Sequence, residues 1–207
     1  MILPLANVVV DLFFNGGPIM YPLLLAALVA IAVVGERLVW LIRFYQSNQP
    51  EVVDEILSAS ERHQWEVAEK LASSSSDPVA RVLLAGLKNR EQGFENSIQV
   101  ASAKELREVN RCLSILDTLV TLAPLLGLLG TVTGIMGSFN SIGVDEIAVA
   151  KVTGGIGEAL IATAAGLGIA IFCLIPLNIL SSRLASLQAE IEAAATTLQV
   201  SLQKKKN

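Results

Sequence analysis

Three long apolar stretches constrain this chain more than any other feature of its sequence. They cover residues 18–42, 113–139 and 153–180, and a helix needs about 20 mainly apolar residues to cross a bilayer. None of them alternates apolar and polar residues with the period of two that is typical of a barrel strand. Charged residues make up only 16% of the chain, against roughly a quarter in soluble domains. The sequence therefore predicts an all-α integral membrane protein with three transmembrane helices.

The remaining segments are predicted to be an N-terminal piece, a cytoplasmic insert, an outer loop and a C-terminal extension. Residues 1–17 are apolar but short, so we expect a helix lying in the membrane interface that ends at the turn signal Asn15-Gly16-Gly17-Pro18. No basic region precedes them, so a cleavable signal peptide is not expected. Residues 140–152 are expected to form the outer loop, and 181–207 to extend the third span as a helix.

The distribution of Lys and Arg predicts the orientation in the membrane. The part before the first span has none, and residues 140–152 contain only Lys151, while the other fourteen lie between Arg37 and Arg111 or from Arg183 onward. Basic residues accumulate on the cytoplasmic side. We therefore expect a multi-pass protein of the bacterial inner membrane with its N-terminus outside and its C-terminus in the cytoplasm.

The insert, residues 43–112, is predicted to be helical throughout. Asp77-Pro78 is a favourable helix start, with Asp as the N-cap and Pro in the first turn. No Gly or Pro interrupts residues 97–122. The second span is therefore expected to continue without a break from the last helix of the insert.

Glu158 is the one charged residue in the third stretch. Placing a charged side chain at the centre of a membrane helix costs about 2.5–3.5 kcal/mol on insertion scales, so such residues usually serve a function. The alternative is that Glu158 lies near the outer end of its helix and merely reaches water.

Small and hydroxyl-bearing residues accompany Glu158 in the second and third spans. Gly127, Gly130, Gly134 and Gly166 are predicted to be helix-packing residues, because small residues let helix backbones approach closely in a membrane. Thr131 and Thr163 either line a pore or bond back to carbonyl groups of their own helices.

Other function classes find no support in the sequence. The net charge of −4 does not indicate nucleic-acid binding. Cys112 and Cys173 do not have the spacing of metal ligands. We find no catalytic triad, zinc-protease motif or phosphate-binding loop. No catalytic residue, metal or cofactor is expected, and the chain is not predicted to be an enzyme.

Two motifs resemble those of the MotA/TolQ/ExbB proton channel family, and the resemblance extends in order over nearly the whole chain. They are Ala123-Pro-Leu-Leu-Gly-Leu-Leu-Gly-Thr-Val-Thr-Gly-Ile-Met and Gly155-Ile-Gly-Glu-Ala-Leu-Ile-Ala-Thr-Ala-Ala-Gly. The resemblance implies a homopentamer around a central pore. It also implies a single-span partner of the ExbD or TolR type, whose membrane aspartate faces Thr131, Glu158 and Thr163. A protein of the TonB or TolA type is a further implied partner.

The sequence departs from the family pattern at the end of the third span. Phe172 follows Ala-Ile where the family has proline, and the proline is Pro176, which indicates a kink about one turn deeper. The short insert argues against a flagellar MotA, and the second-span stretch Ala123-Pro-Leu-Leu-Gly-Leu-Leu-Gly favours ExbB over TolQ. A sodium-driven variant, a non-conducting scaffold and an intramembrane enzyme remain alternatives, although the enzyme would need a second catalytic group opposite Glu158.

Overall fold

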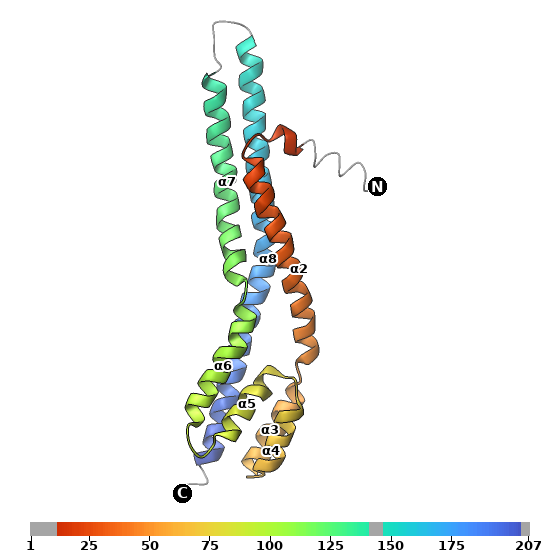
Figure 1. Ribbon diagram of the computed structural model, residues 1–207, viewed down its shortest axis with the longest axis vertical. Coiled ribbons are helices and arrows are strands. Elements are labelled where there is room, and N and C mark those ends of the chain that lie inside the picture. The colour runs from red at the N-terminus through yellow and green to blue at the C-terminus, as the bar shows by residue number, and fades with distance from the viewer. Residues whose placement is uncertain (1–11, 141–146, 204–207) are drawn as a thin grey trace. The chain divides into compact units, whose positions relative to one another are not determined.

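The computed structural model describes residues 12–140 and 147–203, and within them it is all-helical (Figure 1). Residues 12–15 are also helical, whereas the rest of the expected interfacial helix, residues 1–11, lies outside the described part. So do residues 141–146 of the expected outer loop and residues 204–207. The main helices are α2 (Met20–Ser47), α3 (Pro50–Glu61), α4 (Trp65–Ser74), α5 (Pro78–Lys88), α6 (Phe94–Asn110), α7 (Leu113–Asn140) and α8 (Ile147–Gln203).

Three helical segments are long and apolar enough to cross a membrane, as the sequence predicts. They are Met20–Ser47, Phe94–Phe139 and Thr153–Gln203. At most 28% of the most apolar window of each is buried within the chain. Large apolar side chains therefore remain exposed along these helices, as expected for surfaces that contact lipid or other helices.

The chain divides into two compact units. The first, which we call the apolar unit, comprises Met1–Arg37 and Cys112–Leu177, and the second, the amphipathic unit, comprises Leu38–Arg111 and Asn178–Asn207. Both α2 and α8 contribute to each unit. α8 contains Pro176 just before the division. Proline has no N–H group, so the carbonyl of Phe172 lacks its usual partner four residues along the helix.

In the apolar unit, α7 packs antiparallel to the first part of α8. Gly127 lies against Thr163, whereas Gly134, further along α7, lies against Ala159, which is earlier in α8. The start of α2 covers this pair, with Met20 and Leu23 packed on Ala162 of α8. Consecutive long helices thus alternate in direction, which is what three successive membrane crossings require.

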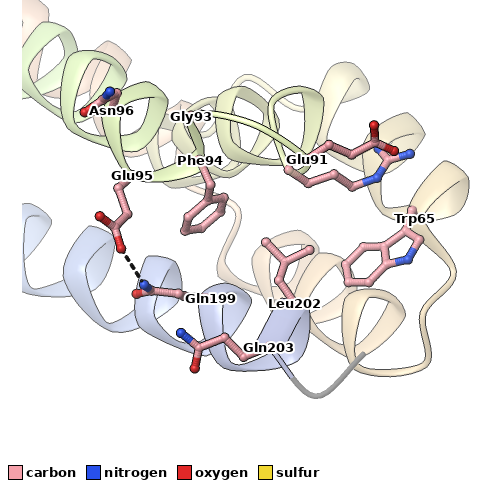
Figure 2. A pocket seen from close by; sticks show the side chains of 10 residues that line it. Trp65, Glu91, Gly93, Phe94, Glu95, Asn96, Gln199, Leu202 and Gln203 are labelled. Atoms are coloured by element: carbon pink, nitrogen blue, oxygen red, sulfur yellow. Dashed lines mark hydrogen bonds between the residues drawn. The ribbon is translucent and has the colours of Figure 1, made fainter. Parts of the chain in front are cut away.

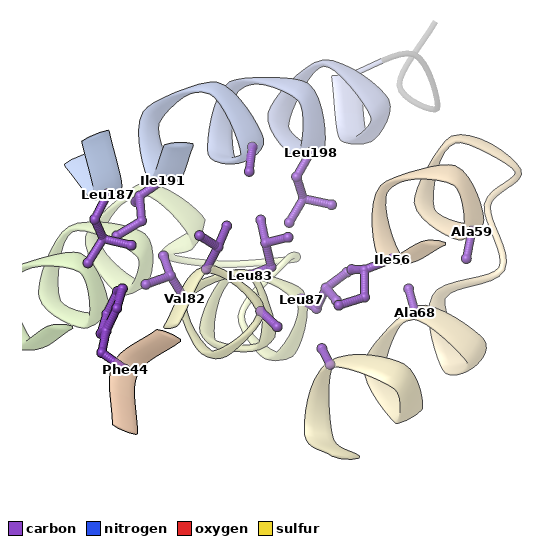
Figure 3. Close-up of a cluster of buried hydrophobic side chains, with 14 of the residues drawn as sticks. Phe44, Ile56, Ala59, Ala68, Val82, Leu83, Leu87, Leu187, Ile191 and Leu198 are labelled. Carbon is purple, nitrogen blue, oxygen red and sulfur yellow. The ribbon is translucent and has the colours of Figure 1, made fainter. Parts of the chain in front are cut away.

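The amphipathic unit has a hydrophobic core of its own. Ile56 of α3, Leu83 and Leu87 of α5, and Leu187 and Leu198 of α8 are all buried in it (Figure 3).

Polar contacts fix the start and the exposed side of α5 in the amphipathic unit. The Asp77 carboxylate accepts hydrogen bonds from the backbone N–H groups of Val79 (2.7 Å) and Ala80 (3.2 Å), so it caps α5 as predicted. On the exposed side, the hydrogen bond from Arg81 to Glu105 raises the pKa of the guanidinium, although desolvation opposes it.

The expected unbroken helix from the insert into the second span is wrong. α6 ends at Asn110, and α7 begins at Leu113 after a turn in which Cys112 has a φ of +63°. This left-handed backbone costs roughly 1–2 kcal/mol for a residue with a Cβ. It also removes the regular hydrogen-bond ladder at the boundary between the two units, and no Gly or Pro in the sequence signals it.

Candidate functional site

Glycines allow α7 and α8 to approach almost backbone to backbone. A Cβ built on Gly127 would lie 2.9 Å from the Cα of Thr163, and one on Gly134 would lie 3.1 Å from the carbonyl oxygen of Gly155. A Cβ on Gly166 would collide with the carbonyl oxygen of Ala123. A side chain at Gly127 or Gly166 would therefore require the two helix backbones to shift, and one at Gly134 would be tightly packed.

Gly130 occupies the point where three helices meet. A Cβ there would lie 2.6 Å from the Cβ of Ala162 on α8 and 2.7 Å from Ile19, next to the start of α2. The structure therefore places all four glycines singled out in the sequence at contacts within one chain.

The two threonines make different hydrogen bonds. The hydroxyl of Thr131 donates to the carbonyl of Leu128 in its own helix (2.7 Å), whereas that of Thr163 donates across the helix contact to the carbonyl of Gly127 (2.9 Å). Thr163 thus joins α8 to α7. Both hydroxyl oxygens can still accept a hydrogen bond from water or from a carboxyl group.

Glu158 lies against the turn that precedes α2. Its carboxylate contacts Gly17, which has a φ of +72° and where a Cβ would overlap the carboxylate. The adjacent Gly16 contacts Ile161 one turn further along α8. A glycine at position 17 leaves room for this half-buried carboxylate, which also lies near the positive end of the α2 dipole.

Glu158 and Thr163 do not lie on one face of α8. Glu158 and Thr163 are five residues apart on α8, which at 3.6 residues per turn separates them by about 140° around the helix and about 7.5 Å along it. Glu158 is directed to the start of α2, whereas Thr163 is directed to α7. Glu158 is level with the beginning of the first long helix, and Thr163 lies deeper.

Some contributing residues were not singled out in the sequence. The sequence predicts only a turn at Gly16 and Gly17, and the signal for their role is a glycine pair directly before a span. Ser138 was also missed. Its buried side chain donates to the carbonyl of Gly134 (2.8 Å) and occupies the space beside Gly155.

A cavity of about 610 Å³ lies in the amphipathic unit. Figure 2 shows Trp65, Phe94 and Leu202 around it, with Gln199 donating to Glu95 (2.9 Å) at one side. Its lining contains no His, Cys or Ser nucleophile. Over the ranges that the structure describes, no group of three His, Cys, Asp or Glu side chains could hold a metal ion.

Three apolar helices of alternating direction, two of them packed through glycines and joined by the Thr163 hydroxyl, are typical of a polytopic membrane protein. The sequence matches the MotA/TolQ/ExbB proton channel family over residues 74–193, more than half of the chain. The chain belongs to this family.

Individual relatives agree with this assignment. The chain is 35% identical to the putative biopolymer transport protein ExbB-like 1 of Synechocystis over 83% of this chain and 70% of that protein. It is 34% identical to ExbB-like 3 of the same organism over 81% of this chain and 82% of the relative. It is 31% identical to the Tol-Pal system protein TolQ of Pseudomonas aeruginosa over 92% and 91%, respectively.

Family membership confirms the resemblance seen in the sequence. The protein is a proton channel family subunit and not an enzyme, because members of this family are channel or stator subunits. Its apolar helices and its bacterial relatives support a location in the bacterial inner membrane.

Proposed function

We propose that this chain is the pore-forming stator subunit of a proton-driven motor. The observation that carries the proposal is the position of Glu158. It is the one charged residue of the apolar stretch 153–180, and its carboxylate packs against Gly17 just before α2. A membrane helix retains such a charge where it serves ion movement.

The proposed proton path uses the carboxylate of Glu158 and the hydroxyl groups of Thr131 and Thr163. The hydroxyl groups can orient water or a carboxyl group, but they do not readily hold a proton. The chain therefore supplies an incomplete relay, and the missing proton carrier is an aspartate on a single-span partner of the ExbD or TolR type. Protonation neutralises that aspartate and lets it pass the apolar wall of the pore.

Assembly as a homopentamer around the partner would place the exposed apolar surfaces of α2, α7 and α8 in contact with neighbouring subunits and lipid. Leu125, Leu128 and Val132 of α7 are about half exposed, as are Leu160 and Leu167 of α8. The membrane potential then supplies about 2.3 kcal/mol per elementary charge per 100 mV to each proton-driven step.

We assign the subunit to an ExbB-like role, energising TonB-dependent outer-membrane transport. The names of the two Synechocystis relatives and the second-span motif favour it. The alternative is a TolQ-like role in envelope maintenance, which is favoured by the relative from Pseudomonas, aligned over nearly its whole length.

Proton flux into liposomes tests the shared path. The chain reconstituted alone should be nearly proton-tight, and co-reconstitution with the single-span partner should produce flux. Replacing sodium with potassium should leave that flux unchanged if protons are the driving ion. Equal flux without the partner would refute the shared path.

The threonine hydroxyls can be tested in the same assay. Thr131→Val and Thr163→Val keep the side-chain shape, and each should abolish flux. Thr163→Val also loses the bond to Gly127, so Thr163→Ser serves as its control, because it restores that bond and should retain flux. Full flux in both valine variants would exclude the hydroxyls from the path.

A further inference from the structure

A second cavity lies where α8 leaves the apolar sequence. It measures about 450 Å³ and is lined by Tyr45 of α2 and by Asn178, Ile179, Ser182, Arg183 and Ser186 of α8. All six belong to the amphipathic unit. The lining offers hydroxyl, amide and guanidinium hydrogen-bond donors but no carboxylate. This composition is suited to an anion.

Arg183 is the cation of this cavity, and most of its hydrogen-bonding capacity is unused. Its side chain is only 13% exposed, and the guanidinium stacks over the ring of Phe44, with 4.9 Å between its central carbon and the ring centroid. Nε and Nη2 are buried and have no hydrogen-bond acceptor among the described residues. Buried charged groups are normally paired, because losing hydration without a partner is unfavourable.

The acceptor that Arg183 does have is weakly held. Nη1 donates to Glu190 two turns further along α8 (3.1 Å), and that carboxylate is 42% exposed. Ion pairs of this kind contribute little to stability. A rotation of the Arg183 side chain away from Glu190 would therefore present the guanidinium to an anion in the cavity.

The position of the cavity indicates where the anion comes from. Asn178 and Ile179 end the apolar stretch 153–180, and Arg37 and Arg43 lie at the corresponding end of the first stretch. Tyr45 is an aromatic residue of the kind found at membrane interfaces. Basic pockets at this depth on the cytoplasmic side are suited to phosphate groups of anionic lipids.

We propose that this cavity binds the phosphate of an anionic phospholipid headgroup in the cytoplasmic leaflet. Arg183 makes charge-assisted hydrogen bonds to the phosphate oxygens, and the hydroxyls of Ser182 and Ser186 donate to the same group. The lipid thereby holds α8 to α2 at the membrane surface. This site is separate from the proposed proton path and does not depend on it.

The test compares two arginine variants of the full chain. Purified protein would be titrated with phosphatidylglycerol in neutral detergent, and bound lipid would be counted by native mass spectrometry. Arg183→Gln should weaken binding about tenfold, the effect of losing one charge-assisted hydrogen-bonded group. Arg43→Gln removes the same charge from an exposed position outside the cavity, so it should change binding by less than about twofold.

A cavity-filling variant keeps the proposal falsifiable if Arg183→Gln fails to fold. Ser186 is exposed, so Ser186→Phe should leave the melting temperature unchanged while it excludes the headgroup and lowers phosphatidylglycerol binding. Retained binding in that variant would overturn the proposal, as would equal losses in the two arginine variants. Inorganic phosphate is the second probe: if it displaces the lipid at equal concentration, the site takes free phosphate and the lipid assignment is wrong.

Discussion

At the scale of single residues, the proposed proton role of Glu158 can be tested separately from helix packing. Glu158 contacts the α2 start and not the threonines, so its side chain can be changed without disturbing the α7–α8 contact. This separation makes function and assembly distinguishable by mutation.

Glu158→Ala should abolish energised function while the complex still assembles. The loss should be about a hundredfold or more, the lower end of what a positioned proton-transferring side chain contributes. Partner-dependent proton flux measures function, and the mass of the purified complex measures assembly. Glu158→Gln keeps the shape and should fail equally; full activity in either variant would mean that Glu158 only reaches water at the helix end.

Gly17→Ala tests the contact between Gly17 and the Glu158 carboxylate. The left-handed backbone there costs roughly 1–2 kcal/mol with a Cβ, and the added methyl group collides with Glu158, so the melting temperature should fall. Gly35→Ala is the control, because nothing lies within 4 Å of its Cβ position. Combining Gly17→Ala with Glu158→Ala removes the collision, so the double variant should be more stable than the two separate losses predict. Strict additivity would show that the contact is unimportant.

At the scale of elements, the apolar unit depends on the packing of α7 against α8. Gly127→Ala should destabilise the chain by about 1–3 kcal/mol, as overpacking does, because its Cβ would meet the backbone of Thr163 and Ala162. Gly137→Ala on the same helix has open space and should be neutral or slightly stabilising. Thermal unfolding in detergent measures both, and similar behaviour of the two variants would contradict the packing role of Gly127.

The elements could be predicted from the sequence where local signals exist. The length of the apolar stretches predicts the three long helices, and Asp77-Pro78 predicts the start of α5. The break at Cys112 could not be predicted, because it has no glycine or proline signal. The Glu158–Gly17 contact and the orientation of Thr163 toward Gly127 depend on the packing of segments far apart in the sequence. Periodicity alone does not specify that packing.

At the scale of the whole molecule, the alternating direction of the long helices and the charge asymmetry give one topology to test. In a background without Cys112 and Cys173, a cysteine at Asn140 should react with an impermeant thiol reagent added outside intact cells. A cysteine at Gln203 should react only after the cells are opened, because basic residues concentrate on its side. Labelling of Gln203 from outside would reverse the proposed orientation.

Pro176 has a spectroscopic consequence. The Phe172 carbonyl that it leaves without a helical partner belongs to a residue that is 45% exposed. Carbonyl groups that lose a hydrogen bond vibrate at higher frequency, so an isotope-labelled carbonyl at Phe172 should absorb above one at Ala170 in the infrared spectrum. If water reaches this carbonyl during turnover, its band should shift downward. The infrared band of the Phe172 carbonyl would then report hydration of α8 close to the division between the two units.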